Sequence, residues 1–171
     1  MELWDLSDAL RRPLGRTHRR GAPMEPGTYH TVVCVWTVNS RGEILLTLRD
    51  PRKDVYPPGM WENTAGSAFA GEESAPAAAR ELFEETGIAV KPRELLLLGT
   101  RREKSAFADT YAVRRDIPRA ALCLLPGETV DARWVTLPQL DALMERGKVA
   151  KPVCERLAEV REKFEAFLNR V

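Results

Sequence analysis

The sequence has few cysteines, no long apolar run and almost no net charge. Its three cysteines, Cys34, Cys123 and Cys154, are odd in number and widely spaced, which argues against a disulfide framework or a zinc site. Apolar runs such as 95–98 and 120–125 are far shorter than the ~20 residues that cross a bilayer. We therefore expect free thiols and no membrane-spanning segment.

The charges nearly cancel, with 26 Lys and Arg residues against 25 Asp and Glu residues and a formal net charge of +1. No overall field therefore steers the chain toward nucleic acid or anionic lipid, so we expect neither a nucleic-acid partner nor a membrane partner. Residues 1–8 are acidic and lack the charged and apolar regions of a secretory signal, which predicts a cytoplasmic location.

The length and composition predict one globular domain. Its 171 residues correspond to about one domain of ~150 residues. The 11 glycines and 12 prolines are too few for a low-complexity chain. We expect a single domain over 1–171, with an N-terminal hairpin and entry segment at 1–29 and a C-terminal helix at 150–171.

The hydrophobic pattern alternates between strand and helix signals. Residues 31–38 and 43–49 are predicted to form a hairpin, residues 94–114 two strands separated near Lys104, and residues 132–135 another strand. Helices are predicted at 74–86, 137–145 and 152–169. Interleaved strands and helices predict an α/β domain with a mixed sheet covered by helices.

The central helix has clear start and stop signals. Ser74 is the expected N-cap, Pro76 fits the first turn and Gly87 is the expected C-terminal stop. One stripe of mostly small residues predicts a close approach to the sheet; its members are Ala75, Ala78, Ala79, Leu82 and Thr86.

Three acids gather on one face of this helix, because Glu81, Glu84 and Glu85 stand at i, i+3 and i+4. A solvated acidic surface is one explanation. Near a helix C-terminus, however, each negative charge is disfavoured by ~0.3–1 kcal/mol, and only Arg80 is placed to reach Glu84. Carboxylate oxygens are ligands for hard ions, so the pattern also indicates a site for Mg²⁺ or Mn²⁺.

With its flanks, this segment follows a longer pattern. Gly66 is followed after five residues by Glu72, and after seven more by the run Arg80-Glu81-Leu82-Phe83-Glu84-Glu85-Thr86-Gly87-Ile88. This resembles the Nudix box, G-x5-E-x7-R-E-U-x-E-E-x-G-U with U aliphatic, at every specified position. A chance match has a probability of roughly 10⁻⁸ per start position at average composition. The chain is therefore similar to the Nudix hydrolase superfamily.

The resemblance implies an α/β/α sandwich with a central mixed sheet and a loop–helix–loop catalytic element. It implies hydrolysis of a nucleoside diphosphate linked to another group, or of a related small-molecule diphosphate, with Mg²⁺ or Mn²⁺ as cofactor. Glu81, Glu84 and Glu85 would be the catalytic metal ligands, and Glu84 or Glu85 would also hold or deprotonate the attacking water. Arg80 and Glu72 would brace the element, and Gly66 would let its backbone approach the metal.

Outside the box, further residues have two interpretations each. Glu128 lies where many family members provide another metal ligand, but it also fits a solvated turn. Arg49 is placed to bind a substrate phosphate or to be an edge-strand charge. Trp61 and Tyr56 suit stacking on a substrate base or packing in the core. The arginines between 11 and 20 suit anion binding or a solvated basic arm.

Residues 2–72 also resemble the isopentenyl diphosphate isomerase branch, through Tyr29-His30-Thr31 and the segment 58–63. That branch moves a proton with a catalytic Cys and binds metal through His. Here Gly66 stands at the Cys position and Ala68 at the next His position, leaving His30 and Glu128 as plausible matches. Hydrolysis is favoured, with an isomerase, a nucleotide-sensing module and an interaction domain as alternatives. The N-terminal hairpin and C-terminal helix are candidate surfaces of a homodimer.

Overall fold

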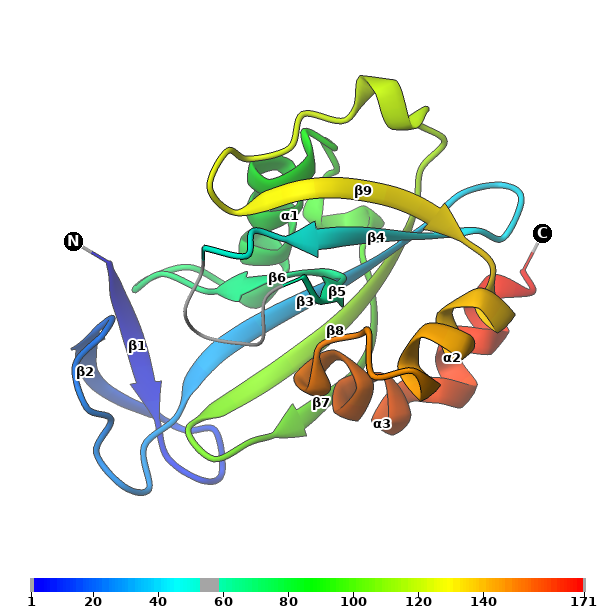
Figure 1. Ribbon diagram of the computed structural model, residues 1–171. Coiled ribbons are helices and arrows are strands. Elements are labelled where there is room, and N and C mark those ends of the chain that lie inside the picture. The colour runs from blue at the N-terminus through cyan, green and yellow to red at the C-terminus, as the bar shows by residue number, and fades with distance from the viewer. Residues whose placement is uncertain (1, 53–58, 171) are drawn as a thin grey trace.

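The computed structural model describes residues 2–52 and 59–170, which form a mixed sheet between helices (Figure 1). The strands are β1 (Leu3–Ser7), β2 (Pro13–Arg19), β3 (His30–Val38), β4 (Ile44–Arg49), β5 (Trp61–Glu62), β6 (Thr64–Ser67), β7 (Leu96–Arg102), β8 (Ala106–Arg114) and β9 (Thr129–Val135). The α-helices are α1 (Ser74–Thr86), α2 (Leu137–Glu145) and α3 (Lys151–Leu168), and short 3₁₀ turns lie at Pro92–Glu94 and Arg119–Ala121.

The seven-stranded sheet has the order β5-β4-β3-β8-β7, with β6 paired to β3 and β9 paired to β4. β3 and β8 run parallel along their whole length, while the other pairs are antiparallel. β3 and β4 are in register only at Val38 and Ile44. Beyond that point β6 takes the place of β4 beside β3, so the sheet divides into two halves. The mixed sheet confirms the predicted α/β class.

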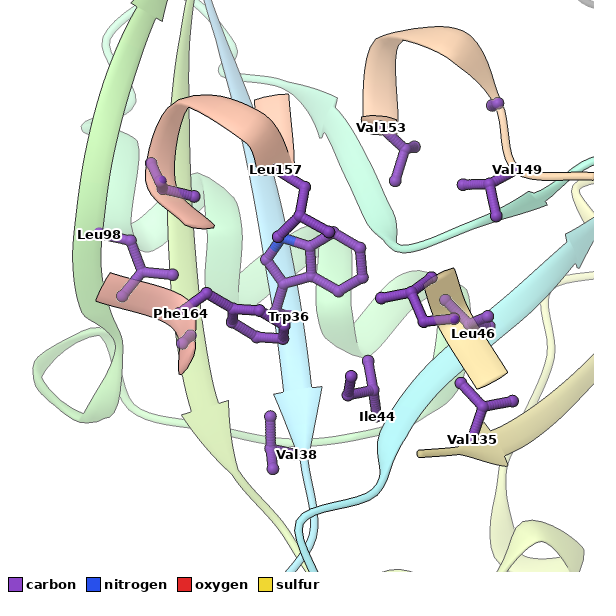
Figure 2. Close-up of a cluster of buried hydrophobic side chains, with 14 residues drawn as sticks. Trp36, Val38, Ile44, Leu46, Leu98, Val135, Val149, Val153, Leu157 and Phe164 are labelled. Atoms are coloured by element: carbon purple, nitrogen blue, oxygen red, sulfur yellow. The ribbon is translucent and has the colours of Figure 1, made fainter. Parts of the chain in front are cut away.

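Each face of the sheet has its own apolar core. On one face Trp36 packs against Phe164 of α3, with ring centroids 5.1 Å apart, and Leu140 of α2 joins the same cluster (Figure 2). On the other face Leu82 of α1 packs with Val33 and Leu45. Since each helix layer covers one face, the molecule has the three-layer α/β/α arrangement.

The bounds of α1 agree with the predicted helix 74–86, but its first turn differs from the prediction. Glu73 precedes the helix as N-cap, so the assignment of Ser74 as N-cap is wrong. Of the predicted packing stripe, Ala78, Leu82 and Thr86 are fully buried and Ala75 and Ala79 only partly, while Ala77, which was not predicted, is fully buried as well. Gly87 ends the helix at φ 76°, as glycine permits.

Two exclusions drawn from the sequence agree with the structure. Cys34, Cys123 and Cys154 are all free thiols, and Cys34 is buried. No helix in the described ranges 2–52 and 59–170 has both the length and the apolar character needed to span a membrane.

The N-terminal segment forms a two-stranded hairpin, β1 with β2, which meets the main sheet through a bridge between Ser7 and Tyr29. Its turn residue Arg11, at φ 60°, reaches into the body of the protein. Nη1 and Nη2 of Arg11 donate to the two carboxylate oxygens of Asp109, at 2.7 and 2.5 Å. The side chain of Asp109 is 3% exposed and also accepts bonds from Ser74 and Thr100, both 2.5 Å. One buried carboxylate thus joins the hairpin, α1 and β7.

We expect Asp109→Ala to lower the free energy of unfolding by about 3 kcal/mol or more, because Arg11, Ser74 and Thr100 lose their shared buried acceptor. Urea denaturation monitored by circular dichroism measures the loss. Glu25→Ala is the matched control, since Glu25 pairs with Arg16 on the surface and should cost less than about 1 kcal/mol. Equal losses in the two variants would contradict the role of Asp109.

Candidate functional site

The three box acids are positioned by the packing of α1. Ala77, Ala78 and Leu82 bury one side of the helix against the sheet, which brings Glu81 against the backbone of Gly66 on β6. A Cβ atom on Gly66 would lie 2.0 Å from Cδ of Glu81. The side chain of Glu81 is therefore 14% exposed, while that of Glu84, one turn later, is 45% exposed.

Arg80 bridges most of the charged groups of the box. Its Nε and Nη2 donate to the two carboxylate oxygens of Glu72, at 2.9 and 2.8 Å. Its Nη1 donates to Glu81 at 2.8 Å and to Glu84 at 3.1 Å, and the guanidinium lies 3.8 Å from the centre of the Phe69 ring. Arg80 and Glu72 thus make the ion pair that the resemblance implies, and the same guanidinium also holds Glu81 and Glu84.

The surroundings shift the pKa values of Glu81 and Glu72, both partly buried, in opposite directions. Burial raises the pKa of Glu81, the charges of Glu84 and Glu2 add to that effect, and Arg80 opposes it. Burial also acts to raise the pKa of Glu72, but hydrogen bonds from Arg80 and from the Phe69 N–H outweigh it and hold that pKa below its usual value. Glu72 is therefore a stable anionic brace.

A cavity of about 550 Å³ opens where the two halves of the sheet separate. Its lining includes most of the predicted site residues: Arg49, Gly66, Arg80, Glu81, Glu84, Glu85 and Glu128. The other lining residues are Glu2, Trp4, Arg20, His30, Ala65, Ser67, Phe69 and Leu125. The structure thus brings Arg49 and Glu128, which lie far from the box in the sequence, to the same cavity as the box acids.

Arg49 and Glu128 are held at the edge of the cavity by β4 and the loop before β9. The side chain of Arg49 is 13% exposed, and its Nη1 lies 3.3 Å from Oε1 of Glu62. The carbonyl of Glu128 accepts a bond from the Asp50 N–H, 2.9 Å long, next to the end of β4. Both residues therefore line the cavity from the half of the sheet that contains β4 and β9.

One predicted stacking residue, Trp61, is not among the described residues that line the cavity. Trp61 lies under the guanidinium of Arg133, 3.9 Å from the ring centre, and packs at the border of the α3-side core. Its assignment to substrate binding stays a prediction that this geometry does not support. Tyr56 lies outside the described residues.

The structure also brings to the cavity residues that sequence reasoning did not assign to it, and they come from the N-terminal segment. The Trp4 indole stacks on the His30 ring, with centroids 4.0 Å apart and planes 11° from parallel. Burial lowers the pKa of His30 to about 4, so this ring is neutral at physiological pH. The sequence offered His30 only as a possible match to a metal ligand of the isomerase branch and assigned no role to Trp4, because their contact depends on how the hairpin folds back.

The donor chemistry of the site fits a divalent cation. Within the described part of the chain, no group of three His, Cys, Asp or Glu side chains is arranged as it stands to enclose a metal ion. Instead the positive guanidinium of Arg80 lies between Glu81 and Glu84. Several carboxylates thus gather around one positive charge, close to the backbone of Gly66, and carboxylate oxygens are the donors that a hard divalent cation prefers.

This chain is similar to known proteins in sequence and in fold. The NUDIX domain family matches residues 28–157. A Nudix hydrolase of Listeria monocytogenes is 38% identical over 154 residues, covering 86% of this chain and 88% of that protein. An isopentenyl-diphosphate Delta-isomerase of Paenarthrobacter aurescens is 32% identical, covering 79% of this chain and 76% of that protein. A crystal structure from Deinococcus radiodurans shares the fold, with a TM-score of 0.77 and 21% identity over 93% of this chain and 99% of that one.

Proposed function

This chain belongs to the Nudix family of pyrophosphohydrolases, and from that premise we propose that it hydrolyses the phosphoric anhydride bond of a nucleoside diphosphate linked to another group, with Mg²⁺ or Mn²⁺. The observation that carries the proposal is the shared cavity. Glu81, Glu84 and Glu85 line the same cavity of about 550 Å³ as Arg49 and Glu128. Hydrolysis of a diphosphate needs positive charge and a nucleophilic water at the same place, and these residues can bind both.

Glu81, Glu84, Glu85 and Glu128 would hold the metal, with the Gly66 backbone close to it. When bound, the divalent ion supplies positive charge to the phosphate oxygens and makes the attacking water more acidic. A carboxylate oxygen of Glu84 or Glu85 accepts the proton of that water. The water oxygen forms a new bond to phosphorus as the anhydride bond breaks, which leaves two phosphate monoesters.

Arg49 and Arg80 have different parts in this proposal. Arg49 lines the cavity and can donate two hydrogen bonds to a phosphate from a half-buried position. Arg80 holds Glu72, Glu81 and Glu84 at once, so it acts as a positioning residue for the carboxylates. This division rests on the contacts of Arg80 with three acids of the box and on the place of Arg49 in the cavity lining, outside the box.

The isomerase alternative lacks its proton-transfer group in the described cavity. Gly66 and Ala68 stand at the positions that the isomerase resemblance gives to Cys and His. The lining contains no cysteine, and burial raises the pKa of the nearby Cys34 to about 11 while Arg156 contacts its sulfur. A thiol-dependent proton shuffle therefore has no support here, although an isomerase is among the relatives.

The N-terminal arginines support a small-molecule substrate rather than a nucleic acid. Within the described residues, four of them pair with acids: Arg11 with Asp109, Arg12 with Asp8, Arg16 with Glu25 and Arg20 with Glu2. Paired arginines leave less positive charge for a phosphate backbone. The cytoplasmic location and the homodimer stay predictions.

Phosphorus NMR of the protein with Mg²⁺ tests the proposal directly. The panel is ADP-ribose, NADH, coenzyme A, dinucleoside polyphosphates, nucleoside triphosphates and isopentenyl diphosphate. We expect the diphosphate signals of one nucleotide class to be replaced by monoester signals, and EDTA to stop the reaction. Rearrangement of isopentenyl diphosphate without phosphate release would favour the isomerase. Cleavage of none, with a Mg²⁺-induced rise in melting temperature, would favour a sensing module.

A further inference from the structure

One wall of the site cavity comes from outside the family match. The NUDIX match begins at residue 28, whereas Glu2, Trp4 and Arg20 belong to the N-terminal hairpin and its flanks. All three line the same cavity as Glu81. Figure 1 shows β1 beside the end of the sheet where β3 begins, with β2 on its outer side. The hairpin is thus part of the site.

This wall is fixed to the loop that carries the first half of the box. The Ala70 N–H donates to the Leu3 carbonyl at 2.8 Å, and the Gly71 N–H donates to Oδ2 of Asp5 at 2.7 Å. Both donors lie between β6 and α1. Together with the buried pair of Arg11 and Asp109, these bonds set the distance between the hairpin and the box acids.

Glu2, Trp4 and Arg20, which together form this wall, hold one another in place through hydrogen bonds. Trp4 stacks on His30, and its Nε1–H donates to Oε1 of Glu2 at 2.9 Å. Nη1 of Arg20 donates to Oε2 of Glu2 at 2.7 Å. Each oxygen of Glu2 has a second lone pair, so the carboxylate can accept further hydrogen bonds from a ligand. The wall therefore offers a fixed acceptor beside an aromatic edge.

We propose that Glu2, Trp4 and Arg20 bind the group attached to the diphosphate and select a polar, hydroxyl-bearing group, such as a nucleoside, over an aliphatic chain. The proposal rests on the proposed function. Glu2 would accept bonds from sugar hydroxyls, while Arg20 fixes its carboxylate. Eight of the fifteen lining residues are charged, and an aliphatic chain placed against them would desolvate those charges without compensation.

Two variants test whether the wall binds substrate, and two matched control variants come from the same N-terminal segment. Glu2→Gln and Arg20→Gln change the pair inside the cavity, whereas Glu25→Gln and Arg16→Gln change a similar ion pair outside it. At saturating Mg²⁺ we expect the first two to raise KM for the cleaved nucleotide about tenfold with kcat within about threefold, because they weaken ground-state binding. The controls should match the wild type. Calorimetry in EDTA, which stops the reaction, with ADP-ribose, UDP-glucose and isopentenyl diphosphate measures the same selection without turnover.

The outcomes distinguish the binding role of the wall from the proposed hydrolase activity. If the wild type cleaves a nucleotide but all four variants share its KM, the wall has no role and the hydrolase stands. If isopentenyl diphosphate binds more tightly than both nucleotides, the selection is overturned. If nothing is cleaved, the role of the wall is still supported when Glu2→Gln and Arg20→Gln bind nucleotide more weakly than the wild type and the two control variants do not. If the wild type and all four variants bind nucleotide equally, or if none binds it, the role of the wall is overturned.

Discussion

Replacing Glu84 by Gln is expected to lower kcat about 1,000-fold while the protein stays folded. The substitution removes a negative charge and one ligand oxygen from the box acids at nearly constant side-chain volume, and such a change at a charge-stabilising group costs about 10²–10³ in turnover. The side chain of Glu84 is 45% exposed, and its Oε2 accepts a hydrogen bond from Nη1 of Arg80 at 3.1 Å. The free energy of unfolding should therefore change by less than about 1 kcal/mol.

Steady-state kinetics with the substrate found by phosphorus NMR, together with urea denaturation, measures both effects. Glu162→Gln is the matched control, because Glu162 is an exposed glutamate of α3 outside the cavity lining. It should leave kcat and stability unchanged. Comparing Glu85→Gln with Glu84→Gln assigns the base, since loss of the base removes the acidic limb of the pH–rate profile. A fully active Glu84→Gln enzyme would disprove its catalytic role.

Most of the fold was predictable because its elements are long and periodic. The buried strand β3 begins one residue before the predicted 31–38, and α3 begins and ends one residue before the predicted helix 152–169. The short strands β5 and β6 were not predicted. Gly66 lies within β6, where glycine is unfavourable, and this strand forms because β3 offers it a partner from Val32 to Val35. Such pairing is a long-range effect that two to four residues do not encode locally.

The site divides in the same way between local and long-range information. The spacing of Glu81, Glu84 and Glu85 along one helix is sufficient to predict their common face. The contribution of Glu2 and Trp4 depends on a hairpin anchored through Asp109, whose partners are 9, 35 and 98 residues away in the sequence. No local pattern marks such a contact.

Ser74 shows how a correct local rule can be overridden. A serine before a helix usually accepts a bond from the backbone, which made it the expected N-cap. Here the Ser74 hydroxyl donates to the buried carboxylate of Asp109 and accepts a bond from the Tyr111 hydroxyl, at 2.9 Å. A buried carboxylate needs donors more than a helix end needs one cap, so the tertiary bond is the one that forms.

Gly66 is where the close approach of backbone and acid can be tested by a single methyl group. A Cβ at this position would lie 2.0 to 2.3 Å from the carboxylate atoms of Glu81, so the carboxylate must move. Because the obstructing atoms are the end of a flexible side chain, the move costs little folding free energy. It does displace Glu81 from the other box acids, and a misplacement of about 1 Å in a catalytic arrangement costs roughly 100-fold in rate.

We therefore expect Gly66→Ala to lower kcat about 100-fold and to leave the urea midpoint nearly unchanged. Gly99→Ala is the contrasting variant, because a Cβ there would lie 2.8 Å from Cγ1 of Val160 in the α3-side core, away from the cavity. It should cost about 1–3 kcal/mol of stability through overpacking and keep kcat. If Gly66→Ala instead loses stability and keeps kcat, the contact between Gly66 and Glu81 serves packing, and the close approach has no part in positioning the acids.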